Sequence, residues 1–323
     1  MQIKSKYIAI LITIAIGVVV AIFCSQSEEN MSVCLWDKQE ARETYDIVPV
    51  DTTSVYDIAI DTCAIPCHLG NSGIAAYRDY IRRGSVSALK GKICVVQLFL
   101  NTPGDGWTEK ERETATNRVY EAEHWLEDKA ADYGTDVDFC TVAFPKNYSM
   151  KNIPSEPCED DNNDNLLHKA FRWLNWNDHD AFLDFIKEEY KCDGVIMLVM
   201  AKATGRSWSL PYTRSNESNG ETDNFAEGAI IFNTSSYSDG SIAPLNAFTV
   251  AHEILHLCGA WDFYEEEGIQ DREHACKAKQ LFPDSIMLIE KDDIDECKLD
   301  EVTAWLVGLK EKKDWYAWFQ PEA

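Results

Sequence analysis

The residues best suited to chemistry lie together in the segment 251–264, which reads AHEILHLCGAWDFY. His252 and His256 are four residues apart, so on a helix their imidazoles lie about 40° from eclipsed and can bind one metal ion. Glu253 is rotated by about 100° from His252. It therefore points beside the metal, where it can take a proton from a metal-bound water.

A third ligand is needed to complete such a site, and the turn after the predicted helix can supply it. Gly259 enters a left-handed cap without strain, so the chain can bend and bring Asp262 back to the ion. Two imidazoles and a carboxylate suit zinc and leave its fourth position open for water. The pattern H-E-x-x-H alone arises by chance in roughly one chain in a hundred of this length, but the glycine and the carboxylate strengthen it. The segment predicts a catalytic zinc site.

Other residues near the motif compete for the metal. Cys258 follows His256 by two residues and faces away from the side that the histidines share, so a disulfide or a packed thiol suits it better than ligation. Carboxylates further along, such as Glu266 or Glu273, would replace Asp262 as the last ligand in a different kind of zinc hydrolase.

The extended motif HEILHLCGAWD resembles the H-E-x-x-H-x-x-G-x-x-H/D signature of the metzincin clan of zinc peptidases. Residues 284–287, DSIM, look like the Met-turn of that clan, which places Met287 beneath the zinc as a soft floor. Most metzincins have His at the position of Asp262, but snapalysin-like members have Asp followed two places later by Tyr, as Tyr264 is here. Astacin-like and serralysin-like members have Tyr two places after the methionine, where this chain has Ile289. Tyr264 is therefore the substitute candidate to line the site, with packing near the site as the alternative.

This resemblance implies an exported zinc endopeptidase. Zinc would activate a water, and Glu253 would accept its proton and deliver it to the leaving amine. A peptide or protein substrate would lie extended along an edge strand and add a strand to the sheet. The predicted edge strand consists of Ala229, Ile230, Ile231, Phe232 and Asn233. A metal-holding binding module that has lost catalysis is the alternative, although nothing in the motif is missing.

These residues must be positioned by a framework in which strands and helices alternate. Apolar runs predict strands at 93–100, 195–200 and 229–232, with another at 137–144. Thr108 and Glu111 form a capping box that begins a long helix. Helices are also predicted over 165–190, with a break near Asn177 and Asp178, over 247–258 and over 300–309, whereas 203–227 is predicted as a polar loop.

This order indicates an α/β layer structure. The metzincin resemblance covers about residues 91–323 and narrows the fold class to α/β (α+β). It implies a mixed twisted sheet with one antiparallel edge strand, packed on long helices, with an active-site helix and a small C-terminal subdomain.

The N-terminal residues predict export. Lys4 and Lys6 precede an uncharged run at 7–23, and Glu28 and Glu29 follow it, which orients the rest of the chain away from the cytoplasm. Cys24 leaves a lipid-modified form open. We predict a signal peptide or anchor at 1–27, an extension or stalk at 28–90 and the peptidase domain at 91–323. The protein would be at the cell surface, periplasmic or secreted, and would touch a membrane only through the N-terminal segment.

Composition limits the partners further. Lys and Arg number 30 against 55 Asp and Glu, a net charge of −25 that disfavours nucleic acid. Apart from Cys24 the chain has ten cysteines, an even number that suggests disulfides in an exported protein. The acidic loop at 159–165 is a weak candidate for Ca²⁺, because it lacks the alternating ligands and the glycine of a known calcium loop.

Overall fold

The computed structural model describes residues 84–154, 166–211, 226–236, 240–264, 272–291 and 293–319. All of them belong to the compact unit Lys38–Ala323. The predicted signal or anchor, residues 28–83 of the predicted extension, the acidic loop at 159–165 and Glu266 lie outside these ranges. Within them, no helix has both the length and the apolar character needed to cross a membrane.

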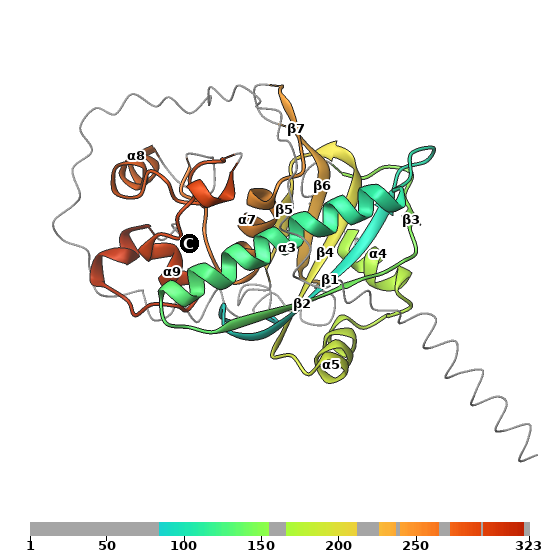
Figure 1. The fold of residues 1–323 in the computed structure, drawn as a ribbon, viewed down its shortest axis with the longest axis horizontal. Helices are drawn as coiled ribbons and strands as arrows, with labels where there is room; N and C mark the ends of the chain where they lie inside the picture. The colour runs from blue at the N-terminus through green and yellow to red at the C-terminus, as the bar shows by residue number, and fades with distance from the viewer. Residues whose placement is uncertain are drawn as a thin grey trace, which may run out of the picture. The chain divides into compact units, whose positions relative to one another are not determined.

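A mixed sheet forms the centre of the described fold (Figure 1). Its main strands follow the order β2 (Val137–Ala143), β1 (Gly91–Asn101), β4 (Gly194–Gly205), β6 (Gly228–Ser236) and β5 (Trp208–Leu210). The first four are parallel, and β5 is antiparallel to β6. Two short strands extend it: β3 (Tyr148–Ser149) pairs with β1, and β7 (Ile242–Pro244) pairs with β6. The predicted combination of α/β layers and a mixed sheet is confirmed.

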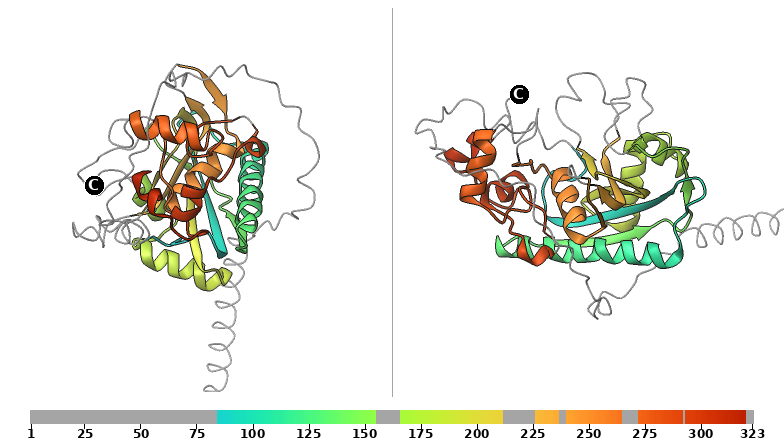
Figure 2. Two further views of the ribbon diagram at one scale, coloured as in Figure 1. Left: turned by 90° about the vertical axis from the view of Figure 1, so that its left-hand side faces the viewer. Right: turned by 90° about the horizontal axis from the view of Figure 1, so that it is seen from above.

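Helices cover both faces of the sheet (Figure 2). One face packs against α3 (Glu109–Asp132) and α7 (Ala247–Leu257), and the other against α4 (Leu166–Trp173) and α5 (His179–Tyr190). Alternate residues of a strand point to opposite faces, so Val95 of β1 enters the first core and Val96 the second. With both faces covered, β1 and β4 are apolar along most of their length, as parallel strands usually are.

The predicted helix boundaries have physical causes in the structure. Thr108 and Glu111 make the expected reciprocal capping box at the start of α3. Asp178 caps α5 by accepting a hydrogen bond from the Ala181 N–H, so the predicted break between two helices is confirmed. The predicted helix at 300–309 is shorter in the structure: α9 spans Glu301–Leu306, with Asp300 as its N-cap.

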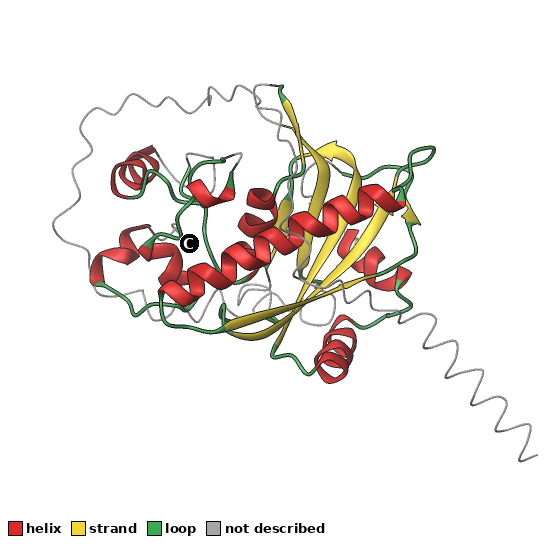
Figure 3. Cartoon of the chain, in the orientation of Figure 1, coloured by secondary structure: helices red, strands yellow, loops and turns green. Residues whose placement is uncertain are grey.

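The described residues after α7 form helices and turns and no regular strand (Figure 3). They comprise α8 (Arg272–Leu281), which the sequence did not predict, the short 3-10 helix η2 (Ile294–Glu296), α9 and η3 (Asp314–Phe319). Their apolar side chains join the core on the α3 and α7 face. Phe263, next to the predicted ligand Asp262, packs on Phe282 and Phe319, so this part buttresses the turn after α7.

The prediction that 229–233 is an edge strand is wrong. Residues of this run lie in β6, which pairs with β4 on one side and β5 on the other. The four residues from Ala229 to Phe232 are fully buried, which is what a continuous apolar run indicates for an interior strand. The strand at the end of the sheet is β5, which lies inside the stretch predicted to be a loop.

Two further expectations need adjustment. Residues 84–90 fall within the predicted extension, yet Val86 and Leu89 are buried in the core, and the Leu89 N–H donates to the Val307 carbonyl at 2.8 Å. The disulfides expected from the cysteine count are not found among the cysteines of the described ranges. These are all free thiols: Cys94, Cys140, Cys192, Cys258, Cys276 and Cys297. Five of them are buried and Cys140 is half-buried, and Cys94 lies opposite Cys140 where β1 pairs with β2. The remaining cysteines lie outside the described residues.

Candidate metal centre

The histidines of the motif lie on α7, whose two ends are both well defined. Asn246 caps the start by accepting a hydrogen bond from the Thr249 N–H at 2.9 Å. At the other end Gly259 is left-handed, with φ of 100°, and its N–H donates to the His256 carbonyl. The Ala260 N–H donates back to the Leu255 carbonyl at 2.8 Å, which completes a Schellman motif. The predicted reversal of the chain after the helix is confirmed.

That reversal brings Asp262 to the two histidines. The Nε2 atoms of His252 and His256 are 3.1 Å apart, and Oδ1 of Asp262 lies 3.2 Å from the first and 3.3 Å from the second. Three ligands around a tetrahedral zinc with bonds of 2.0–2.1 Å would be about 3.3 Å from one another. Oδ1 is buried and has no hydrogen-bond partner. The three residues form a group that can hold a metal ion.

Hydrogen bonds on the far side of each imidazole leave the Nε2 atoms available. Nδ1 of His252 donates to the Ile286 carbonyl at 3.0 Å, and Nδ1 of His256 donates to the Ala260 carbonyl at 3.1 Å. A carbonyl can only accept, so in a neutral imidazole the proton is on Nδ1 and Nε2 carries a lone pair. Two lone pairs and a carboxylate oxygen then face one point, as they do around a bound cation.

The electrostatics of the group favour positive charge. Burial opposes an imidazolium at His256, but the carboxylate of Asp262 outweighs it and raises the pKa of His256 to about 9. Burial likewise opposes ionisation of Asp262, but the His256 and His252 rings hold its pKa far below the ordinary range. A proton on His256 provides part of this positive charge, and a divalent cation would provide more of it.

Glu253 lies beside this group and not in it, as the helical rotation predicts. Its side chain is only 4% exposed, and its Oε2 accepts a hydrogen bond from the Ser209 hydroxyl at 2.7 Å. Ser209 comes from β5, so the end of the sheet reaches the metal centre directly.

The predicted Met-turn packs under the same helix. Met287 is fully buried, and its carbonyl accepts a hydrogen bond from the Phe263 N–H at 2.8 Å. Its N–H donates to the Ser285 hydroxyl, which donates in turn to the buried carboxylate of Asp300 at 2.6 Å. Asp300 also accepts hydrogen bonds from Thr303 and from two N–H groups of α9. The turn that supplies the partner of His252 is therefore fixed by an aspartate that the sequence reasoning missed.

Tyr264 contacts Asp262, the predicted third ligand. Its hydroxyl donates to Oδ2 of Asp262 at 2.9 Å and accepts from Nη2 of Arg206 at 2.7 Å. The guanidinium of Arg206 also lies 5.6 Å from the centre of the Tyr264 ring. Holding Oδ2 in this way directs Oδ1 toward the histidines. Arg206 and Ser209 were missed because they are 58 and 44 residues from their partners, and no local pattern connects them.

The remaining candidates lie elsewhere. Glu273 is on α8 and is not part of the metal group. Cys258 is a buried free thiol packed in the core, which matches the packed-thiol alternative. Ile289 is partly buried against the same core. Of the β6 residues that were expected to bind substrate, Ala229 and Ile230 pair with both β4 and β5, and Ile231 and Phe232 pair with β4.

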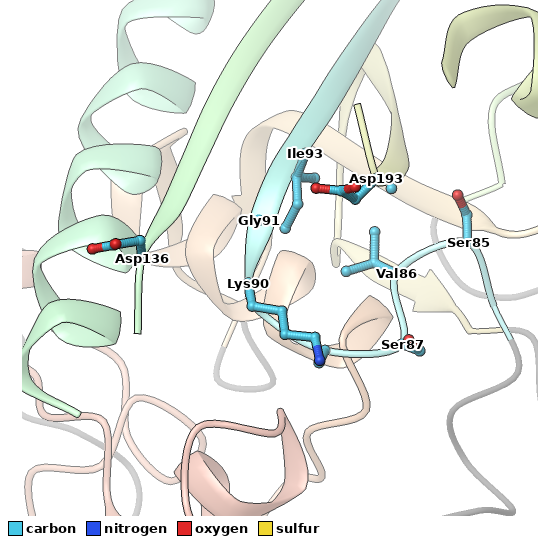
Figure 4. Close-up of a pocket in the computed structure, with 10 residues that line it drawn as sticks. Ser85, Val86, Ser87, Lys90, Gly91, Ile93, Asp136 and Asp193 are labelled. Atoms are coloured by element: carbon cyan, nitrogen blue, oxygen red, sulfur yellow. The ribbon is translucent and has the colours of Figure 1, made fainter. Parts of the chain in front are cut away.

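A separate open pocket of about 500 Å³ lies at the amino ends of β1 and β4 (Figure 4). Its polar side chains satisfy backbone N–H groups at the starts of the strands. Asp193 accepts a hydrogen bond from the Lys92 N–H, and the Ser85 hydroxyl accepts one from the Val195 N–H, both at 2.9 Å. No residue of the metal group lines it. Its hydrogen bonds serve the fold, so the candidate site remains the group on α7.

We compared the sequence with known protein families and curated proteins. No protein-family model matches the sequence, and no match to a curated protein was found. The features that point to a function are therefore the geometry of the site and the resemblance of its motifs.

Proposed function

We propose that the protein is a zinc-dependent endopeptidase of the metzincin type. The observation that carries this proposal is the triangle formed by the two Nε2 atoms and Oδ1 of Asp262, with no hydrogen bond to Oδ1. Imidazole and carboxylate ligands in a tetrahedral arrangement suit zinc. His252, His256 and Asp262 would hold the ion, and bound zinc would supply a Lewis acid that acidifies water and polarises a carbonyl.

The chain's own residues account for the remaining steps. Glu253 accepts the proton of the attacking water at its carboxylate and returns it to the nitrogen of the leaving amine. Burial at 4% exposure keeps this carboxylate apart from bulk water. Tyr264 keeps Asp262 oriented through Oδ2, and the turn around Met287 supports His252 from below.

We place the substrate along β5, and not along β6 as the sequence had predicted. In the described part of the chain β5 is paired on one side only, with β6, and its Ser209 touches the base on α7. A peptide or protein chain adding to this free side would lie beside Glu253. The extracellular, periplasmic or surface location remains a proposal based on the N-terminal sequence pattern.

Peptide-library cleavage by the purified full chain tests the function. We expect cleavage that a chelator abolishes and added zinc restores. A protein that binds one zinc and cleaves nothing would be the binding module considered above. Cleavage that persists after complete removal of metal would overturn the proposal.

A further inference from the structure

One contact of the metal centre joins the end strand of the sheet to the proposed base. Oγ of Ser209 lies 2.7 Å from Oε2 of Glu253 and 3.0 Å from the Glu253 backbone carbonyl. A serine hydroxyl has one proton to donate. The shorter distance and the charge of the carboxylate favour Oε2 as the acceptor.

Glu253 depends on this contact. Its side chain is buried, and a buried carboxylate needs hydrogen-bond donors to offset lost hydration. In the described residues, Ser209 is the one donor to this carboxylate, and Oε1 receives no hydrogen bond from them. The contact therefore limits the rotation of the carboxylate and leaves one oxygen available for a proton.

The position of Ser209 on β5 follows from strand alternation. Trp208 and Leu210 point to the face covered by α4 and α5, so Ser209 points to the opposite face, where α7 lies. A one-residue shift in the pairing of β5 with β6 would turn an apolar side chain toward Glu253. The register of the three-residue strand β5 therefore determines whether Glu253 receives the hydrogen bond from Ser209.

We propose that Ser209 is a positioning residue: its hydroxyl holds Oε2 of Glu253, so that Oε1 is presented to the attacking water. This inference rests on the proposed function for its effect on turnover. It also joins substrate binding to the base, because a peptide added to β5 would contact the strand that orients Glu253.

The neighbouring contact of the same segment provides a contrast. Arg206 acts on Tyr264 and through it on the ligand Asp262, so it supports metal binding. Ser209 touches the base and none of the three ligands. Loss of Arg206 should therefore reduce zinc retention, whereas loss of Ser209 should leave zinc retention unchanged.

The test compares Ser209→Ala and Ser209→Thr in the full chain. Ser209→Ala should lower kcat about tenfold, a fraction of what a general base contributes, with KM and zinc content unchanged. Ser209→Thr keeps the hydroxyl on a β-branched residue that suits a strand, and should restore most of kcat. Ser149→Ala makes the same change on the exposed short strand β3 and should have no effect.

A readout without turnover separates this inference from the proposed function. The ¹³C resonance of the Glu253 carboxyl, assigned with Glu253→Gln, should move in Ser209→Ala and return in Ser209→Thr. If wild type cleaves peptides but Ser209→Ala matches it in kcat and in this resonance, the inference is wrong and the peptidase proposal stands. If wild type cleaves nothing, the peptidase proposal fails and the resonance still decides whether Ser209 holds Glu253.

Discussion

The two histidines of the candidate metal centre are held by regions at very different distances along the chain. His256 donates Nδ1–H to Ala260, four residues away in the turn that ends α7. His252 donates to Ile286, 34 residues away in the predicted Met-turn. The first contact is a product of local helix geometry, whereas the second requires a separate turn to pack under the helix.

The supports of these two regions differ in the same way. The turn after α7 is specified by Gly259 and the Schellman hydrogen bonds, all within a few residues. The Met-turn depends on Ser285 and on Asp300, which belongs to the start of α9. The candidate centre therefore combines a locally encoded half, which carries Glu253 and the three proposed ligands, with a half that only tertiary packing provides. Substitutions in the locally encoded half should abolish catalysis or metal binding. Substitutions in the half built by tertiary packing should only weaken them.

The largest effect is expected in the local half, from Glu253→Gln. The amide keeps the shape of the side chain and cannot take a proton from water, so kcat should fall about a thousandfold while zinc content stays at wild-type level. Steady-state cleavage assays with zinc analysis of the same samples measure both. A variant that cleaves as fast as wild type would remove Glu253 from the role of base.

Removal of the third ligand should have the next largest effect. Asp262→Ala leaves two histidines and should weaken zinc binding by more than about a hundredfold, because loss of partners that merely orient ligands already costs 10–100-fold. Asp262→His should retain zinc, since imidazole is also a zinc ligand. Zinc titration against a competing chelator measures this, with Glu273→Ala as the control on α8. Loss of zinc in Glu266→Ala together with normal binding in Asp262→Ala would contradict the ligand set.

Asp300→Ala tests the half built by tertiary packing. The change leaves the hydroxyls of Ser285 and Thr303 and two N–H groups without their acceptor, so the free energy of unfolding should fall by about 3 kcal/mol. Release of the Met-turn should also weaken zinc binding about tenfold through Ile286 and His252. Urea denaturation and zinc titration measure the two effects.

Asp178→Ala is the matched control for Asp300→Ala. It removes an exposed helix cap on the opposite face of the sheet. It should cost about 1 kcal/mol and leave zinc binding unchanged. Equal zinc affinities of the Asp300 variant and this control would show that the Met-turn does not support His252.

The smallest predicted effect concerns Glu301, at the start of α9. Partial burial opposes its ionisation, but hydrogen bonds from Lys313, Tyr316 and Lys310 lower its pKa to about 2. A carboxyl whose pKa is lower in the folded state stabilises the fold above its unfolded pKa of about 4.3 and loses that contribution as pH falls toward 2. Glu301→Gln should therefore be less stable than wild type at pH 7, by about 1 kcal/mol, and this difference should shrink to a small fraction of that value by pH 2.

Unfolding curves between pH 2 and pH 7 check this window, with the exposed Glu311→Gln as control. A stability difference that persists unchanged at pH 2 would mean that the Glu301 carboxylate is not the source. A difference equal to that of the control at pH 7 would mean that its three partners contribute nothing.

How much of this could be predicted from the sequence follows the same division. The capping box of α3, the break before α5 and the turn at Gly259 were predictable because each is encoded within a few residues. Strand order was not predictable, because β5 has only three residues and is recognisable only when paired with β6. For that reason the edge of the sheet was placed on β6.

The same limit applies to the candidate site. His252, Glu253, His256 and Asp262 lie within eleven residues, and their spacing indicates one site. Three further residues contact the site only through tertiary structure. Ser209 donates to Glu253, Arg206 donates to Tyr264, and Asp300 accepts from Ser285. Each contact joins residues that are distant in the sequence, so no local pattern indicates it.

X-ray absorption at the zinc K-edge would show whether His252, His256 and Asp262 bind one zinc ion, as we propose. The zinc-loaded full chain should show a first shell of nitrogen and oxygen at about 2.0–2.1 Å, with an imidazole pattern from two histidines and no sulfur. The imidazole signal should weaken in His252→Ala. A zinc–sulfur distance of about 2.3 Å would place the metal on cysteines and rule out this ligand set.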